Sequence, residues 1–484
     1  MTLKVLSVAS EAVPLVKTGG LADVVGALPA ALASHDVEVT TLLPGFPAVM
    51  KSIRKGRKIA EFESLLGEPA RVVSARLDDG RKLLVLDAPA YFTREGGPYG
   101  DGSGADWNDN WRRFAALGNA AARLAGVGGK KGKFDLVHAH DWQAAMAPVY
   151  LRFGGHPVPS VLTIHNMAFQ GYFGAEVFPR LGLPDSAWTM QGVEFHGGVG
   201  MLKGGMVCAD AITTVSPTYA REIHTPAFGM GLDGVIRART NLVQGILNGI
   251  DTAEWNPETD QHLAAHFSPQ KLGKRKANKS AVEKAFGLET GDGPLFIVVS
   301  RLTWQKGIDV LLEVIDHLVG LGGRLALLGS GEPELEQGLK EAAERHPGKV
   351  GLKFAYDEPL SHLMQGGGDA ILVPSRFEPC GLTQLYGLAY GCIPVVARTG
   401  GLADTVIDAN PAAMAEKSAT GVVFAQASYD ELALAISRTI RLFDDPPAWR
   451  RLQRCAMRAD FGWSASAAQY AGLYRRLVEA AKWA

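Results

Sequence analysis

Two cations lie close together in the segment SRLTWQKG, residues 300–307. Arg301 and Lys306 follow an apolar run and precede a glycine. A planar guanidinium binds two phosphate oxygens at once, an ammonium acts as a point charge, and together they suit a diphosphate. A solvated surface pair is the plainer interpretation. Because both cations follow a predicted strand, the sequence favours an anion site.

A single carboxylate, Glu378, stands in the loop of PSRFEPCGLTQLYGLAYG, residues 374–391. A predicted strand leads into this loop, and an apolar helix is expected to open at residues 381–383. The N–H groups of a helix N-terminus hold phosphate, and a carboxylate beside them can bond a sugar hydroxyl. The alternative is a helix-capping glutamate next to a buried Cys380. We favour a loop that binds a phosphorylated sugar.

The letters TGGLAD occur twice, after Lys17 and after Arg398. In the first copy the lysine precedes the glycines, so it is neither a Walker loop nor a G-x-G-x-x-G turn. Gly19 and Gly20 would let backbone N–H groups approach an anion at the start of a helix near Leu21. A tight strand-to-helix turn is the alternative for both copies. For the second copy the two interpretations stay open.

Histidines and other polar residues follow two further predicted strands, in HAHDWQAA and TIHNMAFQG. His138 and His140 alternate onto one face, yet two histidines with no other clustered ligands do not make a metal site, so we interpret them as core histidines with satisfied hydrogen bonds. Asp141, His165 and Asn166 stand where strands give way to loops. Polar groups in such places suit a carbohydrate.

These residues must be positioned by strands that alternate with Ala- and Leu-rich helical stretches. In the first half the predicted strands lie in KVLSVAS, EVTTLLP, KLLVLDAP, FDLVHAHD, SVLTIHN and AITTVSP, and in the second half in LFIVVSRL, RLALLGSGE, VGLKFAY, DAILVPSRF, IPVVAR and GVVFAQ. Nearly continuous apolar runs of this kind indicate strands buried on both faces of a parallel sheet. The alternation restarts after a polar stretch, which puts a domain boundary near residues 250–275. Ligands bind at the carboxyl ends of such strands, so we expect one cleft between two α/β units.

The bulk composition excludes several classes of protein. The chain has 484 residues, enough for two domains, with 49 Lys and Arg against 50 Asp and Glu. The net charge of -1 argues against a protein that binds nucleic acid or an anionic membrane, because such proteins carry an excess of positive charge. The four scattered cysteines argue against a disulfide or zinc framework. No signal peptide or membrane-length apolar run is evident, so we expect a cytoplasmic protein.

Nine motifs, in this order along the chain, resemble one known family. They are KTGGLADVVGALP, HAHDWQA, TIHNMAFQG, TTVSPTYAREI, ILNGID, SRLTWQKG, LALLGSGEP, PSRFEPCGLTQLYGLAYG and RTGGLADTV. The chain is similar to the ADP-glucose-dependent glycogen synthases of bacteria, which are related to plant starch synthases. The resemblance implies an α/β GT-B fold, in which two Rossmann-like domains with parallel sheets face each other across a deep interdomain cleft.

The resemblance also implies a division of the chain and an activity. Residues 1–255 would form the acceptor-side domain, residues 256–460 the domain that binds the nucleotide-sugar donor, and residues 461–484 a helix crossing back to the first domain. The implied reaction is a retaining transfer of glucose from ADP-glucose to the non-reducing end of an α-1,4-glucan. ADP is released, and neither a cofactor nor a metal is implied.

Site residues follow from the resemblance position by position. The implied catalytic residues are Glu378, Lys306, Arg301, His165 and Asp141, and the implied substrate-binding residues are Lys17, Gly19, Gly20, Tyr99, Asn166, Asn248, Tyr356, Cys380, Gly381, Leu382 and Thr383. The main-chain carbonyl of His165 would face the anomeric carbon. Tyr356 would lie beside the adenine.

Two departures and three rival functions accompany this interpretation. Many members of the wider GT-B group carry a second Glu eight positions after the first, and this chain has Tyr386, the starch-synthase form. The stretches GVGMLKGGMVCAD and MQGGGDA are rich in glycine, so weak local helices are expected there.

The rival functions are a UDP-glucose-dependent enzyme, a phosphorylase with a pyridoxal cofactor, and a glucan-binding scaffold without catalysis. The oligomeric state cannot be read from the sequence.

Overall fold

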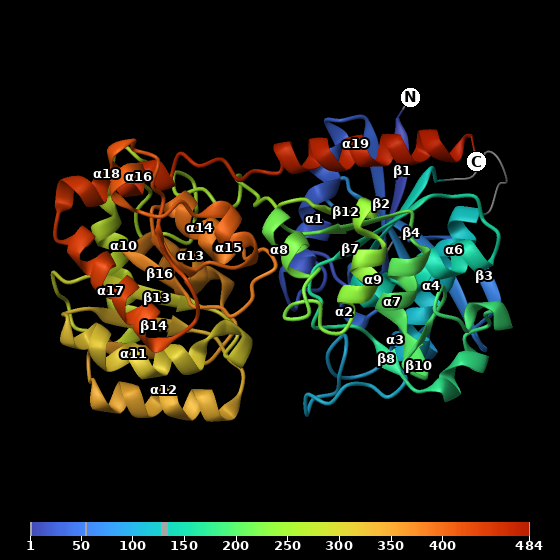
Figure 1. Cartoon of the computed structure of the whole chain (residues 1–484), viewed down its shortest axis with the longest axis horizontal. Helices are drawn as coiled ribbons and strands as arrows, with labels where there is room; N and C mark the ends of the chain where they lie inside the picture. The colour runs from blue at the N-terminus through green and yellow to red at the C-terminus, as the bar shows by residue number, and fades with distance from the viewer. Residues whose placement is uncertain (1, 54–55, 127–133, 484) are drawn as a thin grey trace. The chain divides into compact units, whose positions relative to one another are not determined.

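The computed structural model describes residues 2–53, 56–126 and 134–483, which form two compact units. The first unit comprises Met1–Gly249 and Trp463–Ala484, and the second comprises Ile250–Gly462. Each unit is a twisted sheet with helices on both faces (Figure 1). Among the described residues, every helix is too short or too polar to traverse a bilayer.

The first unit is built on a nine-stranded sheet in the order β12-β11-β7-β6-β1-β2-β5-β4-β3. All six strands predicted in this half are present, as β1 (Leu3–Val8), β2 (Val37–Pro44), β5 (Lys82–Asp87), β6 (Leu136–His140), β7 (Ser160–Ile164) and β11 (Ala211–Thr214), and β12 (Val243–Gly245) follows at the edge. These strands run parallel. The chain leaves β1 toward β2 on one side and returns as β6 on the other. Loops that follow β1 and β6 therefore meet at a switch point, where such sheets bind ligands.

The other edge of this sheet is antiparallel and was not predicted. It consists of β3 (Arg57–Leu65) and β4 (Glu68–Arg76), and β4 pairs with β5. Their sequences, RKIAEFESL and EPARVVSAR, mix charged and apolar residues because one face is solvated, so they lack the continuous apolar signal of a parallel strand. The same unit has a small antiparallel sheet of β8 (Tyr172–Phe173), β10 (Gly198–Gly200) and β9 (Glu194–Phe195).

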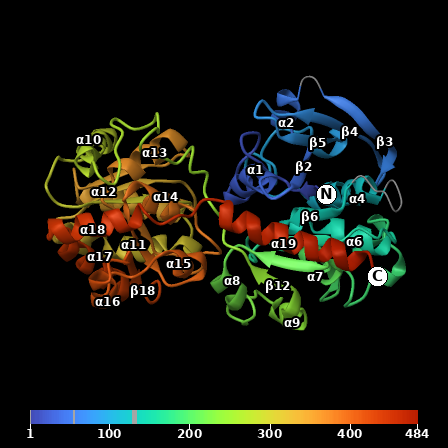
Figure 2. The same ribbon diagram turned by 90° about the horizontal axis from the view of Figure 1, so that it is seen from above.

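Helices cover both faces of the first sheet. They are α1 (Gly20–Ala33), α2 (Pro47–Ser52), α3 (Pro89–Phe92), α4 (Asn110–Gly126), α5 (Asp141–Ala144), α6 (Met146–Phe153), α7 (Met201–Cys208), α8 (Pro217–Glu222), α9 (Asp233–Ala238) and α19 (Ser464–Ala481). The final helix α19, drawn in red, lies along the first unit beside α1 (Figures 1 and 2). Its buried Tyr470 and Tyr474 pack with Leu28 and Leu32 of α1 and Val5 of β1. This apolar contact ties the end of the chain to its first strand.

The second unit is a six-stranded parallel sheet in the order β15-β14-β13-β16-β17-β18. Its strands are the six predicted ones: β13 (Leu295–Val299), β14 (Arg324–Leu328), β15 (Val350–Lys353), β16 (Ala370–Val373), β17 (Ile393–Ala397) and β18 (Val422–Phe424). Its helices are α10 (Arg275–Phe286), α11 (Ile308–Gly320), α12 (Pro333–Arg345), α13 (Glu358–Gly367), α14 (Thr383–Tyr390), α15 (Gly400–Thr405), α16 (Pro411–Ala415), α17 (Tyr429–Phe443) and α18 (Pro446–Ala456). The switch point lies between β13 and β16, the strands that precede Arg301 and Glu378.

The two glycine-rich stretches form helices, α7 and α13, although weak helices were expected. Their glycines serve close packing. A Cβ atom at Gly205 would lie 2.7 Å from the carbonyl O of Ala145, and one at Gly367 would lie 2.6 Å from the carbonyl O of Asn278. Tertiary contacts thus outweigh the low helix propensity of glycine at both sites.

Candidate active site

The first TGGLAD turn presents an open helix N-terminus. Helix α1 begins at Gly20 with Asp23 in its first turn, as predicted, and Gly19 precedes it in an extended conformation. Both glycines are exposed, and no atom lies within 4 Å of where a Cβ atom of Gly19 would stand. Lys17 Nζ lies 2.8 Å from Asp23 Oδ1. The turn therefore offers solvent-facing N–H groups and a cation, the arrangement that suits an anion.

A buried carboxylate that sequence reasoning missed, Glu11, holds this turn in place. Glu11 is only 3% exposed and accepts hydrogen bonds from the backbone N–H and the hydroxyl of Thr18, the latter at 2.6 Å. It also accepts a hydrogen bond from Tyr99, whose hydroxyl lies 2.7 Å from Ser10 Oγ. Burial, and then the charge of Glu11, raises the pKa of Tyr99 well above its usual value, so Tyr99 stays a neutral donor. The only signal for Glu11 in the sequence was its place directly after the first strand.

Three buried histidines, His138, His140 and His165, lie in β6 or directly after β7 in the first sheet. His138 bonds Thr163 Oγ1 through Nε2 at 2.6 Å and the Tyr474 hydroxyl through Nδ1 at 2.8 Å. Both ring nitrogens have partners, which confirms the interpretation of His138 as a core histidine. Burial lowers the pKa of its imidazole to about 3.

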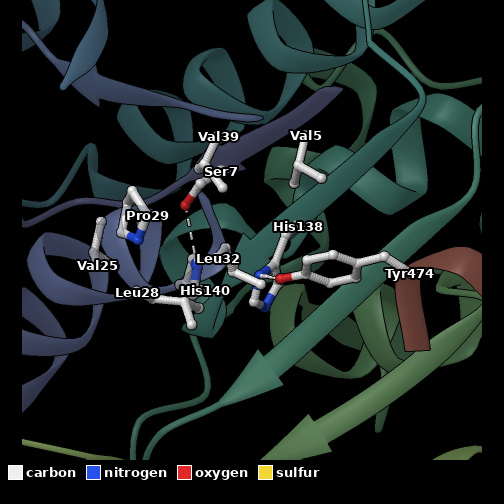
Figure 3. Close-up of a pocket in the computed structure, with 10 residues that line it drawn as sticks. All are labelled: Val5, Ser7, Val25, Leu28, Pro29, Leu32, Val39, His138, His140 and Tyr474. Atoms are coloured by element: carbon white, nitrogen blue, oxygen red, sulfur yellow. Dashed lines mark hydrogen bonds between the residues drawn. The ribbon is translucent and has the colours of Figure 1, made fainter. Parts of the chain in front are cut away.

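His140 connects the first strand to His165. Its Nε2 lies 3.2 Å from Ser7 Oγ, and its Nδ1 lies 3.0 Å from His165 Nε2. Burial lowers the pKa of both imidazoles, that of His165 to about 3, so the two neutral rings share one N–H between them. Figure 3 shows the Ser7 hydroxyl pointing at His140 and the Tyr474 hydroxyl pointing at His138. These residues line a small cavity of about 10 Å³. Among the described residues, no group of His, Cys, Asp and Glu could hold a metal ion.

Asp141 joins the ends of β6 and β7. It is buried, has a left-handed backbone (φ 55°), and accepts a hydrogen bond from the backbone N–H of His165 at 2.6 Å. Burial raises its pKa to about 7, although the hydrogen bonds from the N–H groups of His165 and Asn166 lower that pKa in part. A positive φ at a non-glycine residue marks a position that its surroundings hold in place. The structure thus brings together Asp141, His165 and Asn166.

In the second unit the carboxylate and one cation meet. Lys306 ends a short 3-10 turn (Trp304–Lys306), and its Nζ lies 2.5 Å from Glu378 Oε2. Ser375 donates a hydrogen bond to the same oxygen at 2.9 Å, and Glu378 is 6% exposed. Arg301, by contrast, is exposed. The predicted pair of cations therefore divides into one that fixes a carboxylate and one that faces solvent.

The loop after Glu378 runs into α14, which begins at Thr383 as predicted. Gly381 takes the left-handed conformation (φ 73°) that releases the chain into the helix. The amide of Gln384 donates to the carbonyl groups of Cys380 and Gly381 at 3.0 and 2.9 Å. These bonds hold the two residues that lead into the helix, whose first N–H groups have no intrahelical partner and so suit a phosphate. Sequence reasoning had not singled out Gln384.

Tyr356 and Asn248 were also predicted as substrate-binding residues. Tyr356 is 72% exposed and donates a hydrogen bond to Glu358 at 3.0 Å. Asn248 belongs to the first unit and is 5% exposed, and its buried Oδ1 has no hydrogen-bond partner in the described part of the chain.

Tyr386, the departure from the wider group, belongs to an aromatic stack. The centroid of its ring lies 3.6 Å from that of Trp255, at an interplanar angle of 11°. The ring of His362 also stacks on Trp255, with a centroid distance of 3.6 Å and an interplanar angle of 14°. His362 Nδ1 lies 2.7 Å from Asp260 Oδ2. An aromatic ring at 386 therefore completes a packed core, a task that a glutamate cannot perform.

Two Rossmann-like sheets, each with polar residues at a switch point, are the architecture of the GT-B fold class of glycosyltransferases, and two family models match this class. The family model described as the starch synthase catalytic domain matches residues 4–238, and the one described as glycosyl transferases group 1 matches residues 281–454. The chain is 66% identical over 482 residues to a glycogen synthase of Novosphingobium aromaticivorans, with 99% of each chain covered. It is 57% identical over 478 residues to glycogen synthase 1 of Rhizobium meliloti, covering 98% of this chain and 99% of that protein. The chain belongs to the glycogen synthase family.

Solved structures agree with this assignment. The catalytic domain of starch synthase IV from Arabidopsis thaliana, bound to ADP and acarbose, superimposes with a TM-score of 0.90 at 32% identity and covers 99% of this chain and 100% of that domain. A sucrose-phosphate synthase from Thermosynechococcus elongatus has a TM-score of 0.60 at 18% identity, with 99% of this chain and 100% of that chain covered. This second likeness concerns the fold alone.

Proposed function

We propose that this enzyme transfers glucose from ADP-glucose to the non-reducing end of an α-1,4-glucan, releases ADP and so elongates glycogen. The similarity to a glycogen synthase at 66% identity over 99% of both chains carries the proposal. The starch synthase bound to ADP and acarbose supports the choice of an adenine nucleotide and a glucan. Residues 1–255 would serve the acceptor, residues 256–460 the donor, and residues 461–484 would form a helix belonging to the first domain.

The residues of the second unit would stabilise the leaving group. As the bond from the anomeric carbon to ADP breaks, negative charge grows on the diphosphate. Arg301 and Lys306 would neutralise it, and the N–H groups at residues 381–383 would add the field of the α14 N-terminus. Glu378, fixed by Lys306 at 2.5 Å, would orient the sugar through its hydroxyl groups. Tyr356 would stack on the adenine.

The residues of the first unit would bind the reacting sugar and the acceptor. Lys17 with the open Gly19-Gly20 turn would contact the donor phosphate. The buried Asp141 fixes the backbone of His165, whose carbonyl would face the anomeric carbon. The glucan hydroxyl arrives on the face from which ADP departs, forms the new bond to the anomeric carbon, and passes its proton to the departing phosphate. The configuration is thereby retained without a covalent enzyme intermediate.

The test is the release of ADP from ADP-glucose by the purified full chain, followed with a coupled assay. We expect release that depends on added glycogen and labelled glucose that appears in the glucan. Release at the same rate without glycogen, or no release, would overturn the proposal. UDP-glucose as a competing donor in the same assay distinguishes the nearest rival, and a pyridoxal absorbance band in the near ultraviolet would indicate a phosphorylase.

We place the enzyme in the cytoplasm, acting on these two substrates without a membrane or nucleic-acid partner. Cell fractionation with an antibody to the chain tests the location. Recovery in the membrane pellet would contradict it.

A further inference from the structure

The second TGGLAD turn lies against the loop that carries Glu378. It follows β17 and opens α15, and β17 is the neighbour of β16, the strand that precedes Glu378. The backbone N–H of Gly401 lies 3.0 Å from the carbonyl O of Glu378 and 3.2 Å from that of Pro379. The turn therefore grips the Glu378 loop by its main chain.

The contact leaves no room for a side chain at either glycine. A Cβ atom at Gly400 would lie 1.9 Å from the carbonyl O of Glu378, and one at Gly401 would lie 2.1 Å from the carbonyl O of Cys380. Gly400 also has a left-handed backbone, with φ of 43°. Both clashes are with main-chain atoms, so a substitution must move the Glu378 loop itself.

A hydrogen-bond chain links the turn to the start of α14. The Thr405 hydroxyl donates to the carbonyl O of Gly401 at 2.6 Å, and the amide of Gln384 lies 3.3 Å from Thr405 Oγ1. The same amide nitrogen donates to the carbonyl O of Cys380. All of these side chains are buried or half-buried, so water does not compete for the bonds.

We propose that Gly400 and Gly401 are positioning residues, which fix the main chain of the Glu378 loop so that its carboxylate stays on Lys306, and that this turn is not a second phosphate site. Both glycines are buried, and the N–H of Gly401 is already bonded to the loop. The proposal deepens the proposed function and rests on it for the role of Glu378. The second pair of glycines acts on the reaction through Glu378.

A double-mutant cycle tests this role. Gly401→Ala should lower kcat about tenfold or more in the wild-type background, because it displaces the loop that carries Glu378. In a Glu378→Gln background the same change should lower kcat by less than about threefold, because the carboxylate it positions is already absent. An equal loss in both backgrounds, or no loss in either, overturns the proposal.

Two further variants guard against a simple folding defect. Thr405→Val keeps the shape of the side chain and removes only its hydrogen bonds, and it should give a smaller loss of kcat in the same direction. Gly320→Ala is the matched control, because Gly320 is exposed at the end of α11 with no atom within 4 Å of its Cβ position, and it should leave kcat unchanged. A loss from Gly320→Ala equal to that from Thr405→Val would overturn the proposal.

Hydrogen exchange gives an outcome that does not depend on activity. Gly401→Ala should speed amide exchange in residues 376–384 and leave residues 17–23 unchanged. Unchanged exchange in residues 376–384 would overturn the positioning role even if the wild-type enzyme transfers glucose. A wild-type enzyme without transfer, combined with faster exchange in that loop, would instead refute the proposed function and keep the contact.

Discussion

The two TGGLAD turns share six letters and differ in what they face. In the first, Gly19 and Gly20 are exposed, and the space in front of Gly19 is open. In the second, Gly400 and Gly401 are buried against the main chain of the enzyme itself. Glycine is needed in the second turn because the main chain of the Glu378 loop comes close to it, and under the proposed function a ligand would come close to the first turn. The motif therefore provides a turn that another group can approach closely, and the fold around each copy determines which group that is.

The largest expected effect comes from Lys306, which bonds the carboxylate of the loop that the second turn holds. Lys306→Ala removes the cation that lies 2.5 Å from Glu378 and that would face the leaving diphosphate. We expect kcat to fall about a hundredfold or more, the usual cost of losing one group that stabilises developing charge. Steady-state kinetics with ADP-glucose and glycogen measure it, and circular dichroism checks the fold. Near-normal turnover would remove Lys306 from the catalytic residues.

Glu11 makes the corresponding prediction for the first turn. Glu11→Gln keeps the size of the side chain and removes the charge that accepts hydrogen bonds from Thr18 and Tyr99. Hydrogen bonds to a charged group contribute about 1.5–3 kcal/mol, so we expect kcat/KM to fall about tenfold as the turn loosens. Glu63→Gln, on an exposed position of β3, serves as the control. Equal kinetics for the two variants would show that Glu11 does not position the turn.

Alanine at Gly400 and Gly19 separates the two turns most directly. Gly400→Ala should lower the thermal unfolding midpoint by several degrees, because overpacking typically costs about 1–3 kcal/mol. Gly19→Ala should leave the midpoint within about one degree, since Gly19 has an extended backbone that any residue adopts and faces open space. Its methyl group would instead stand where the donor phosphate approaches and raise the KM for ADP-glucose about threefold to tenfold.

Differential scanning calorimetry and donor titrations check this pair. Equal shifts in midpoint for the two alanine variants would erase the distinction between an open and a closed turn. An unchanged KM for Gly19→Ala would leave the first turn without a donor contact.

The strands around these turns could be predicted from sequence, and the polar contacts could not. Apolar runs predicted the parallel strands of both sheets, because a strand buried on both faces has a simple composition. The strands β3 and β4 at the edge were not predicted, because many of their residues face solvent and the sequence there has no continuous apolar run. The start of α1 at Gly20 followed from local chemistry, whereas the closed environment of Gly400 arises from residues 22 positions earlier in the chain that only the sheet order brings into contact.

The same limit applies to single residues of the site. Arg301 and Lys306 look alike in sequence, yet one is exposed and the other bonds Glu378. Glu11 and Gln384 make several of the hydrogen bonds that hold the two loops, and neither lies in a pattern that announces it. Residue type and spacing therefore predicted which loops matter, while the pairing inside each loop required three-dimensional structure.

The last expected effect concerns Asp141, which joins the ends of β6 and β7. Burial raises its pKa from 3.8 to about 7 in the folded protein. Between about pH 4 and pH 7 the folded state keeps a proton on Asp141 that the unfolded state has lost. The stability that this proton provides is therefore complete below about pH 4 and is lost as the pH rises through about 7. Asp141→Asn keeps an oxygen for the N–H of His165 and tolerates the left-handed backbone, but it does not titrate. The wild-type enzyme should therefore lose thermal stability relative to Asp141→Asn as the pH rises across that window, measured by calorimetry in matched buffers. A difference between the two proteins that stays constant with pH would mean that Asp141 is already charged in the folded state, held by the N–H groups of His165 and Asn166.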